Sequence, residues 1–352
     1  MSKLKIGDVV IDDKSPCFVV AEIGHNHQGN LETCKRMFEA AKECGVNAVK
    51  LQKRDNKSLY LEAFYNSPYN SENAYGSTYG AHREALEFGW ESYLELKSYA
   101  ESLDLIFFAT AFDIPSADFL ERLGVPCYKI ASGDLKTIPF LKYIASFGKP
   151  MIISTGGSIL EDIRRAYEEI FPLNHQLAIL HCTAMYPIID EHESKVNLRV
   201  IETLRREFPN IVIGFSDHSN GILFSAAGYV CGARIIERHF TLNRIMRGTD
   251  HAFSLEPKGM KKLVKYLQRL YVGMGDGQKY FYEEEKPFIR KMAKMIVAAR
   301  DLSAGDLLSF NDFNFKSPAN GLEPYWWDKL IGRRLIVPVK KDHPILIEYL
   351  DN

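Results

Sequence analysis

The sequence has little cysteine, no long apolar run and almost no net charge. Its 352 residues include six cysteines, and no two of them are spaced as C-x-x-C. This usage is typical of reduced thiols, which favours the cytoplasm over a disulfide scaffold. No run approaches the roughly 18 apolar residues of a membrane helix, and the N-terminal segment lacks an apolar signal stretch. We therefore expect no membrane partner.

The charges nearly cancel. Lysine and arginine number 44, aspartate and glutamate 45, and the net charge is −1. Such a chain has no global field that attracts nucleic acid or an acidic membrane surface. We therefore expect no nucleic-acid partner, and any anionic ligand must be bound by local cations.

After a short N-terminal lead, apolar and amphipathic segments alternate regularly. The apolar segments are short and rich in β-branched residues, which predicts eight strands, each followed by a helix. They are residues 18–24, 47–52, 106–112, 127–132, 150–157, 176–187, 211–217 and 233–238. Eight such units predict an α/β fold, the closed (β/α)₈ TIM barrel. A doubly wound open sheet is the alternative, but no G-x-G-x-x-G follows the first strand.

Three further stretches fall outside this alternation. Residues 53–90 are polar and rich in tyrosine and asparagine, which favours a substrate lid. Residues 276–289 are charged and lack helical periodicity, which predicts a linker after a barrel domain spanning 1–275. Residues 290–352 contain short strand-like runs punctuated by glycine and proline. They predict a separate small domain.

Two histidines end the last two predicted strands. His218 follows IVIGFSD and His239 follows ARIIER. Adjacent parallel strands lie roughly 5 Å apart, so the two imidazoles are expected near each other, where they could hold a metal ion. The alternative is that each histidine is a hydrogen-bonded wall residue. Carboxylates at Asp217, Glu237 and Asp250 favour the metal site.

Two lysines also stand near strand ends. Lys50 and Lys129 are accompanied by hydroxyl groups and by the glycine-rich turns SGD, STGG and SDHSNG. Ammonium groups beside hydroxyls and backbone amides suit a phosphate or a carboxylate. A structural ion pair is the alternative for either lysine alone. Together with a metal opposite, they predict a small polyanion held against a polarised carbonyl.

Several segments resemble the sialic acid synthase family. They are AEIGHNHQGN, VKLQ, STYGAHREALEF, YKIASGD, ISTGG, CTAMYP, VNLRVIETL, GFSDHS, ERHFTL and GTDHAFSLEP. The similarity runs nearly end to end, and the C-terminal domain resembles the antifreeze-like or SAF module. The resemblance implies condensation of phosphoenolpyruvate with the open-chain aldehyde of an N-acetylated hexosamine. The products are a nine-carbon 3-deoxy-2-keto sugar acid and phosphate.

The resemblance also implies roles for single residues. His218 and His239 hold a divalent cation, with Mn²⁺ expected and Mg²⁺ or Co²⁺ as alternatives, and Glu22 handles a proton or the attacking water. The residues expected to bind phosphoenolpyruvate are Lys50, Thr110, Lys129, Ser132, Ser154 and Ser216. Those expected on the sugar side are Asn73, Tyr186 and Asp250. A homodimer in which the small domain of one subunit caps the other's barrel is implied as well.

The sequence departs from the family pattern twice. Ala184 replaces an asparagine of the CT-x-x-YP segment, and Lys316 and Ser317 stand where many members carry an arginine that reaches the partner's site. Lys316 is the expected substitute, although lysine lacks the bidentate fork. The acceptor therefore stays open between N-acetylmannosamine, its 6-phosphate and a diamino-dideoxy hexose of the legionaminic or pseudaminic type. Two more distant functions also stay open, a condensing enzyme for a phosphorylated pentose or tetrose and a catalytically silent carbohydrate-binding protein.

Overall fold

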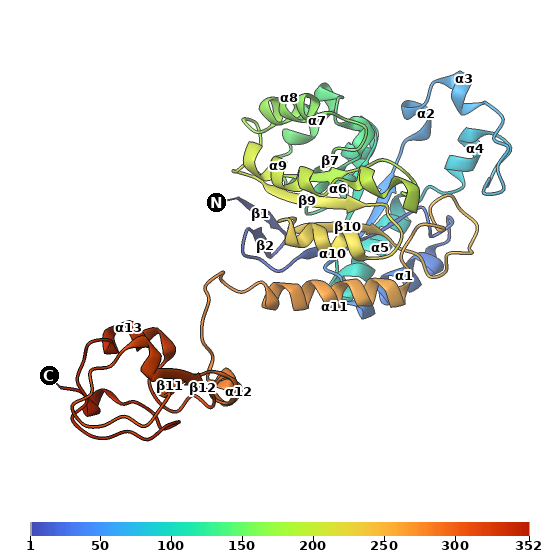
Figure 1. Cartoon of the computed structure of the whole chain (residues 1–352). Coiled ribbons are helices and arrows are strands. Elements are labelled where there is room, and N and C mark those ends of the chain that lie inside the picture. Colours follow the sequence, from blue (N-terminus) through green and yellow to red (C-terminus); the bar gives the residue numbers. More distant parts are fainter. Residues whose placement is uncertain (1, 352) are drawn as a thin grey trace. The chain divides into compact units, whose positions relative to one another are not determined.

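The structure is a computed structural model that describes residues 2–351, and it divides between Gly275 and Asp276 into two compact units. The first unit holds the predicted barrel, and the second holds the C-terminal domain (Figure 1). In the described part of the chain no helix combines the length and the apolarity needed to cross a bilayer.

Eight parallel strands close into a barrel in the order β10-β3-β4-β5-β6-β7-β8-β9. Their bounds are β3 Phe18–Gly24, β4 Ala48–Lys53, β5 Ile106–Ala111, β6 Tyr128–Ile130, β7 Met151–Ser154, β8 Leu177–Cys182, β9 Val212–Asp217 and β10 Ile235–His239. Because the strands are buried on both faces, they read in the sequence as continuous apolar runs. The TIM-barrel prediction is confirmed.

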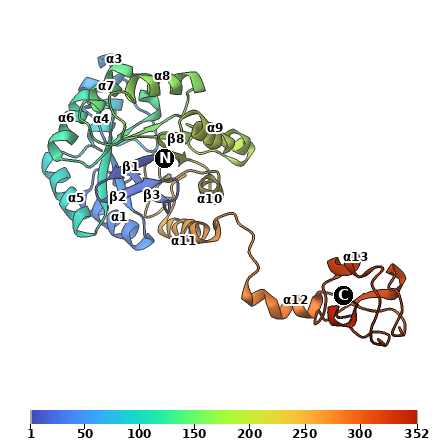
Figure 2. The same cartoon turned by 90° about the vertical axis from the view of Figure 1, so that its left-hand side faces the viewer.

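A ring of helices surrounds the strands (Figure 2). The bounds are α1 Leu31–Cys44, α5 Trp90–Ser102, α6 Ile114–Leu123, α7 Ile138–Ala145, α8 Leu160–Ile170, α9 Arg199–Glu207, α10 Leu223–Val230 and α11 Pro257–Gly273. Local signals set their ends. The side chain of Asn30 caps α1 by accepting from the backbone N–H of Thr33, and Gly45 ends it at a φ of 82°.

The fourth and sixth predicted strands were too long at their carboxyl ends. The fourth was expected to reach Ser132, but β6 ends at Ile130 and Ser132 begins a 3₁₀ turn, Ser132–Asp134. The sixth was expected to continue to residue 187, but β8 ends at Cys182. Apolar character persists past the last ladder hydrogen bond, so hydrophobicity alone does not mark where pairing stops.

The N-terminal lead is a β-hairpin. Strands β1 (Lys3–Ile6) and β2 (Val9–Asp12) pair antiparallel. The backbone N–H of Lys5 donates to the side chain of Gln176, just before β8, and Arg234, just before β10, donates to the carbonyl of Asp13. The hairpin therefore covers the end of the barrel opposite the carboxyl ends of the strands. Strands of four residues gave too short a pattern to predict.

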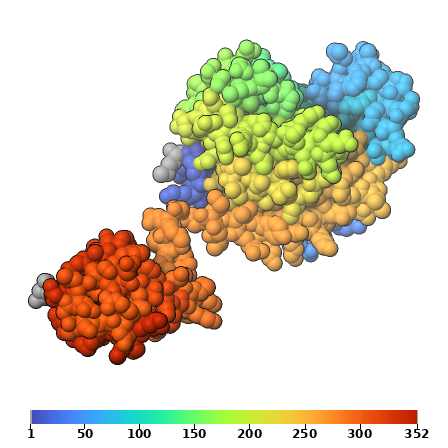
Figure 3. Space-filling model, viewed as in Figure 1, coloured from blue at the N-terminus to red at the C-terminus, as the bar shows by residue number. Residues whose placement is uncertain are grey.

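The stretch predicted as a lid contains three short helices, α2 (Asn56–Leu59), α3 (Glu62–Tyr65) and α4 (Tyr79–Glu84). It forms a lobe of its own, coloured light blue in Figure 3. The lobe contacts the loop after β10, because the hydroxyl of Tyr75 donates to the carbonyl of Arg247 at 2.7 Å.

The second unit has its own small core. Strands β11 (Met295–Ala298) and β12 (Phe313–Lys316) pair antiparallel, and α13 spans Trp327–Leu330. Residues 276–289, predicted to be a linker, are irregular only in part. A 3₁₀ turn lies at Glu283–Glu285, and α12 begins at Lys286 and ends at Met292. A helix of seven residues is too short to show a clear apolar period, which explains the error.

Candidate active site

A cavity of about 450 Å³ opens at the carboxyl ends of the barrel strands. Barrel enzymes place their active sites at this end. Most of the residues that the sequence analysis selected line it. They are Glu22, Lys50, Thr110, Lys129, Ser132, Ser154, Tyr186, Ser216, His218, His239 and Asp250.

The first two barrel strands contribute a buried ion pair. Glu22 of β3 and Lys50 of β4 are register partners, so the ammonium of Lys50 contacts Oε2 of Glu22. The same ammonium donates to the hydroxyl of Thr110 at 2.9 Å, and Gln52 Nε2 donates to Glu22 Oε1 at 2.7 Å. Burial raises the pKa of Glu22 despite the neighbouring Lys50. Glu22 is therefore closer to proton exchange at neutral pH than an exposed glutamate is.

The second lysine, Lys129, lies on β6, which is separated from β4 by one strand, and it lines the same cavity as Lys50. Lys129 Nζ donates to the hydroxyl of Ser154 at 2.6 Å. Glu237 Oε1 lies 3.7 Å from Lys129 Nζ and 3.8 Å from Lys50 Nζ, so one carboxylate serves two ammonium groups. Burial by itself would raise the pKa of Glu237, but the two ammonium groups lower it. The lysine donors that remain can bind an anionic ligand.

The two histidines meet as the strand pattern predicted. Glu237 of β10 pairs with Ser216 of β9, and the ring centroids of His218 and His239 are 5.4 Å apart. Nδ1 of His218 lies 3.1 Å from the carbonyl of Thr183, so Nδ1 donates to that carbonyl and Nε2 is the ring nitrogen that remains for another partner. Burial lowers the pKa of His239 to about 4, so its ring is neutral at pH 7.

These features fit a divalent cation. A carbonyl that orients one ring nitrogen and leaves the other free is the usual arrangement behind a metal-binding histidine. Nδ1 of His239 is buried without a hydrogen bond, 3.7 Å from Asp250 Oδ2. Within residues 2–351, no cluster of three or more histidine, cysteine or acidic side chains has the arrangement of a complete metal site. The pair therefore leaves positions for oxygen ligands from water or substrate.

Aromatic rings border the histidine pair. The ring centroid of Tyr186 lies 4.3 Å from that of His218, and the centroid of Phe253 lies 4.9 Å from that of His239. Phe253 is buried, whereas Tyr186 is 55% exposed and lines the cavity, so Phe253 packs behind the pair and Tyr186 lies on its open side.

A close-packed turn forms the wall near Ser154. The backbone N–H of Gly156 donates to the hydroxyl of Ser132 at 2.9 Å. A Cβ at position 156 would lie 2.8 Å from the Cβ of Ala184 and 2.9 Å from that hydroxyl. The small residues at 156 and 184 therefore set the position of Ser132.

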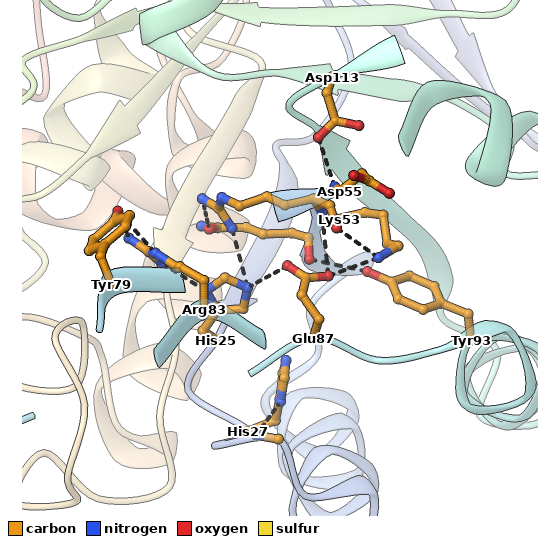
Figure 4. A network of polar contacts seen from close by, with 12 residues as sticks. His25, His27, Lys53, Asp55, Tyr79, Arg83, Glu87, Tyr93 and Asp113 are labelled. Atoms are coloured by element: carbon orange, nitrogen blue, oxygen red, sulfur yellow. Dashed lines mark hydrogen bonds and ion pairs between the residues drawn. The ribbon is translucent and has the colours of Figure 1, made fainter. Parts of the chain in front are cut away.

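The sequence analysis missed two arginines in the cavity, Arg54 and Arg83. Arg54 could have been found, because Lys50, Gln52 and Arg54 alternate along β4 and its extension and all three line the cavity. Arg83 lies on α4, where no strand pattern points to the barrel. Figure 4 shows Arg83 beside His25, within a polar network that also holds Lys53 and Glu87.

Two of the expected site residues do not line the cavity. Asn73 belongs to the lid, and its Oδ1 accepts from the backbone N–H of Gly248 at 2.9 Å, so it ties the lid to the loop after β10. Lys316 lies in the second unit, where its ammonium pairs with Asp342. Their expected roles in binding the sugar and completing a partner's site stay predictions.

Comparisons with known proteins agree on one family. The model of the NeuB family matches residues 37–279, and the model of the SAF domain matches residues 293–350. The chain is 36% identical to the N-acetylneuraminate-9-phosphate synthase of Homo sapiens, over 97% of this chain and 95% of the human protein. It is 35% identical to the N,N'-diacetyllegionaminic acid synthase of Legionella pneumophila, over 95% of each.

Solved structures agree with these matches. The N-acetylneuraminic acid synthetase of Leptospira borgpetersenii, crystallised with citrate, shares 33% identity with a TM-score of 0.69, covering 82% of this chain and 95% of that one. A spore coat polysaccharide biosynthesis protein E of Chromobacterium violaceum shares 25% identity with a TM-score of 0.77, covering 96% and 100%.

Proposed function

Because this chain belongs to the NeuB family and carries a SAF domain, we propose that it condenses phosphoenolpyruvate with the open-chain form of an N-acetylhexosamine. The reaction also consumes one water, and the products are a nine-carbon 2-keto-3-deoxy sugar acid and phosphate. The chain is an enzyme of the nonulosonate synthase type, since its relatives are named as synthases of sialic, legionaminic and pseudaminic acids. N-acetylmannosamine or a related sugar is the proposed acceptor.

The observation that supports this proposal is the presence of two buried ammonium groups and two buried imidazoles around one cavity. Lys50 and Lys129, with the hydroxyls of Thr110 and Ser154, supply donors on one side. Phosphoenolpyruvate has a phosphate and a carboxylate, and fixed cations can hold both in register for attack from C3. Ser132 and Ser216 add hydroxyl groups to the same cavity.

The acceptor belongs on the side of the imidazoles. His218 and His239 would hold a divalent cation, with Mn²⁺ proposed and Mg²⁺ or Co²⁺ as alternatives, and such an ion polarises a carbonyl oxygen when bound. Tyr186 and Asp250 line this part of the cavity and are proposed to orient the sugar. Glu22 is the proposed acid–base group, because its pKa is raised by burial and it lies beside the lysine that would hold the donor.

We also propose that the enzyme is a cytoplasmic homodimer in which the SAF domain of one subunit completes the site of the other. Apolar side chains of the second unit support an interface, since Phe288 is 69% exposed, Met292 64% and Tyr325 64%. Mixing two inactive variants, His218→Ala and Lys316→Ala, would then restore part of the activity. No restoration, with both variants dimeric by light scattering, would oppose this arrangement.

The test is phosphate release from phosphoenolpyruvate with each candidate sugar supplied in turn, and mass spectrometry of the product. We expect release that depends on the sugar and a product heavier than the sugar by the three-carbon unit. Binding of sugars without phosphate release would support the silent carbohydrate-binding alternative. Release only with a phosphorylated pentose or tetrose would support the alternative condensing enzyme.

A further inference from the structure

Two arginines of the cavity share one histidine. Arg54 follows β4 and Arg83 lies on α4, so the barrel and the lid each contribute one. Nη1 of Arg54 lies 3.2 Å from Nε2 of His25, and Nη1 of Arg83 lies 3.3 Å from Nδ1 of the same ring. Figure 4 shows His25 beside Arg83 and Glu87.

The imidazole cannot accept from both guanidinium groups. Burial and the two arginines hold the pKa of His25 well below its ordinary value, so the ring is neutral and has one N–H and one acceptor nitrogen. If Nε2 carries the proton, it faces Glu87 Oε1 at 3.5 Å, and Arg54 loses its acceptor. If Nδ1 carries the proton, Arg83 loses its acceptor. In either case one guanidinium N–H points at another N–H.

In the part of the chain that the structure describes, neither guanidinium group makes direct contact with a carboxylate. Among residues 2–351, no acidic side chain forms an ion pair with Arg54 or Arg83, although Arg54 is only 7% exposed. The more deeply buried Arg238 is paired with Asp217 at 2.5 Å. Arg54 instead stacks on Phe112, with its guanidinium carbon 3.7 Å from the ring centroid. A stack on one face leaves for a ligand those in-plane N–H groups that do not point at His25 or Gln52.

Arg54 is connected to Glu22 through the side chain of Gln52, and all three residues line the cavity. Nη2 of Arg54 donates to Gln52 Oε1 at 2.8 Å, and Gln52 Nε2 donates to Glu22 at 2.7 Å. One amide group therefore separates the guanidinium from Glu22. The anionic groups of phosphoenolpyruvate are already matched by Lys50 and Lys129.

We propose that the acceptor sugar carries a phosphate ester at the end distant from its aldehyde, and that Arg54 and Arg83 bind this group and determine acceptor specificity. The proposal rests on the proposed function. Nε and Nη2 of Arg83 donate to the hydroxyl of Tyr79, so its remaining N–H groups would contact the ligand. A phosphate monoester has three terminal oxygens and a charge near −2, so it can accept from two guanidinium groups at once. It would also supply the acceptor that the His25 arrangement lacks.

The test compares N-acetylmannosamine with its 6-phosphate as acceptors, by kcat/KM for phosphate release. We expect the wild-type enzyme to prefer the 6-phosphate by at least about tenfold, which corresponds to about 1.4 kcal/mol. Arg54→Gln and Arg83→Gln should each reduce that preference toward one, because each lowers kcat/KM for the phosphorylated sugar more than for the neutral sugar. Circular dichroism and urea denaturation of each purified variant show whether it is folded.

A matched control is Arg122→Gln. Arg122 stacks on Trp90 at the same 3.7 Å as Arg54 on Phe112, but it does not line the cavity. This variant should keep the wild-type preference. A wild-type enzyme that uses the neutral sugar equally well or better, or a preference unchanged in both cavity variants, would overturn the proposal. If neither sugar supported phosphate release, that result would instead count against the proposed function.

Discussion

Glu22 and Lys50 form an ion pair whose side chains are 1% and 3% exposed, at neighbouring strand ends of the barrel. A charge pair this deeply buried is costly to desolvate, and removing one partner leaves the other uncompensated. Lys50 would then have only Glu237, at 3.8 Å, as an acidic neighbour. The pair thus bears on both stability and activity.

Glu22→Gln is expected to lower the unfolding free energy by about 3 kcal/mol and kcat by roughly 100-fold, with a smaller change in KM. The double variant Glu22→Gln with Lys50→Met removes both charges and should recover most of the stability but none of the activity. Urea denaturation and phosphate-release kinetics measure the two effects. A double variant as unstable as the single one would contradict the account of the pair.

Chelation should abolish phosphate release, and Mn²⁺ should restore it. His218→Ala and His239→Ala are each expected to lower kcat/KM by at least about 100-fold, because the rings would hold the cation that polarises the aldehyde. His175→Ala is the control, since that ring is exposed and lies outside the cavity. Full activity of the chelated enzyme would remove the basis for a metal at this pair.

Gly156→Ala should weaken binding of phosphoenolpyruvate without unfolding the chain. The new Cβ would meet the Cβ of Ala184 and the hydroxyl of Ser132, so that hydroxyl must move. We expect kcat/KM for phosphoenolpyruvate to fall by about tenfold, mainly through KM. Adding Ala184→Gly removes the nearer clash and should restore part of the loss, and an unchanged KM in the single variant would argue against the role of this turn.

Acid should destabilise the barrel through its buried histidines. Burial lowers the pKa of His27 to about 3, against 6.5 when unfolded. Between these values the unfolded chain binds the extra proton, so stability is full above pH 6.5 and falls as the pH is lowered. One such histidine accounts for about 2 kcal/mol between pH 7 and pH 5.

His27→Asn keeps an acceptor for the backbone N–H of Gly29, which donates to Nδ1 of His27, but it cannot take up the proton. Its unfolding free energy, followed by circular dichroism in urea, should fall less between pH 7 and pH 5 than that of the wild type. His175→Asn should follow the wild type. If the unfolding free energies of His27→Asn and the wild type fell equally between pH 7 and pH 5, His27 would not titrate as its burial implies.

The alternation of apolar and amphipathic segments was sufficient to predict the barrel, because strands buried on both faces must be apolar and each must be followed by a covering helix. The alternation of side chains along a strand also predicted that His218 lies beside His239. Applied to β4 and continued two residues past Gln52, the same alternation would have predicted Arg54 in the cavity. The pattern failed at short elements. The hairpin Lys3–Asp12 and the helix Lys286–Met292 are too brief to have a period.

The sequence by itself determined the fold class, the order of the strands and which side chains stand at their carboxyl ends, because these follow from local periodicity and from the geometry of a closed parallel sheet. Only the tertiary structure decided that Arg83 of the lid meets His25 of the barrel, and that neither Arg54 nor Arg83 forms an ion pair with an acidic side chain among residues 2–351. Such contacts join residues far apart in the chain. Whether a charge is balanced depends on all of its neighbours in space, which no local pattern records.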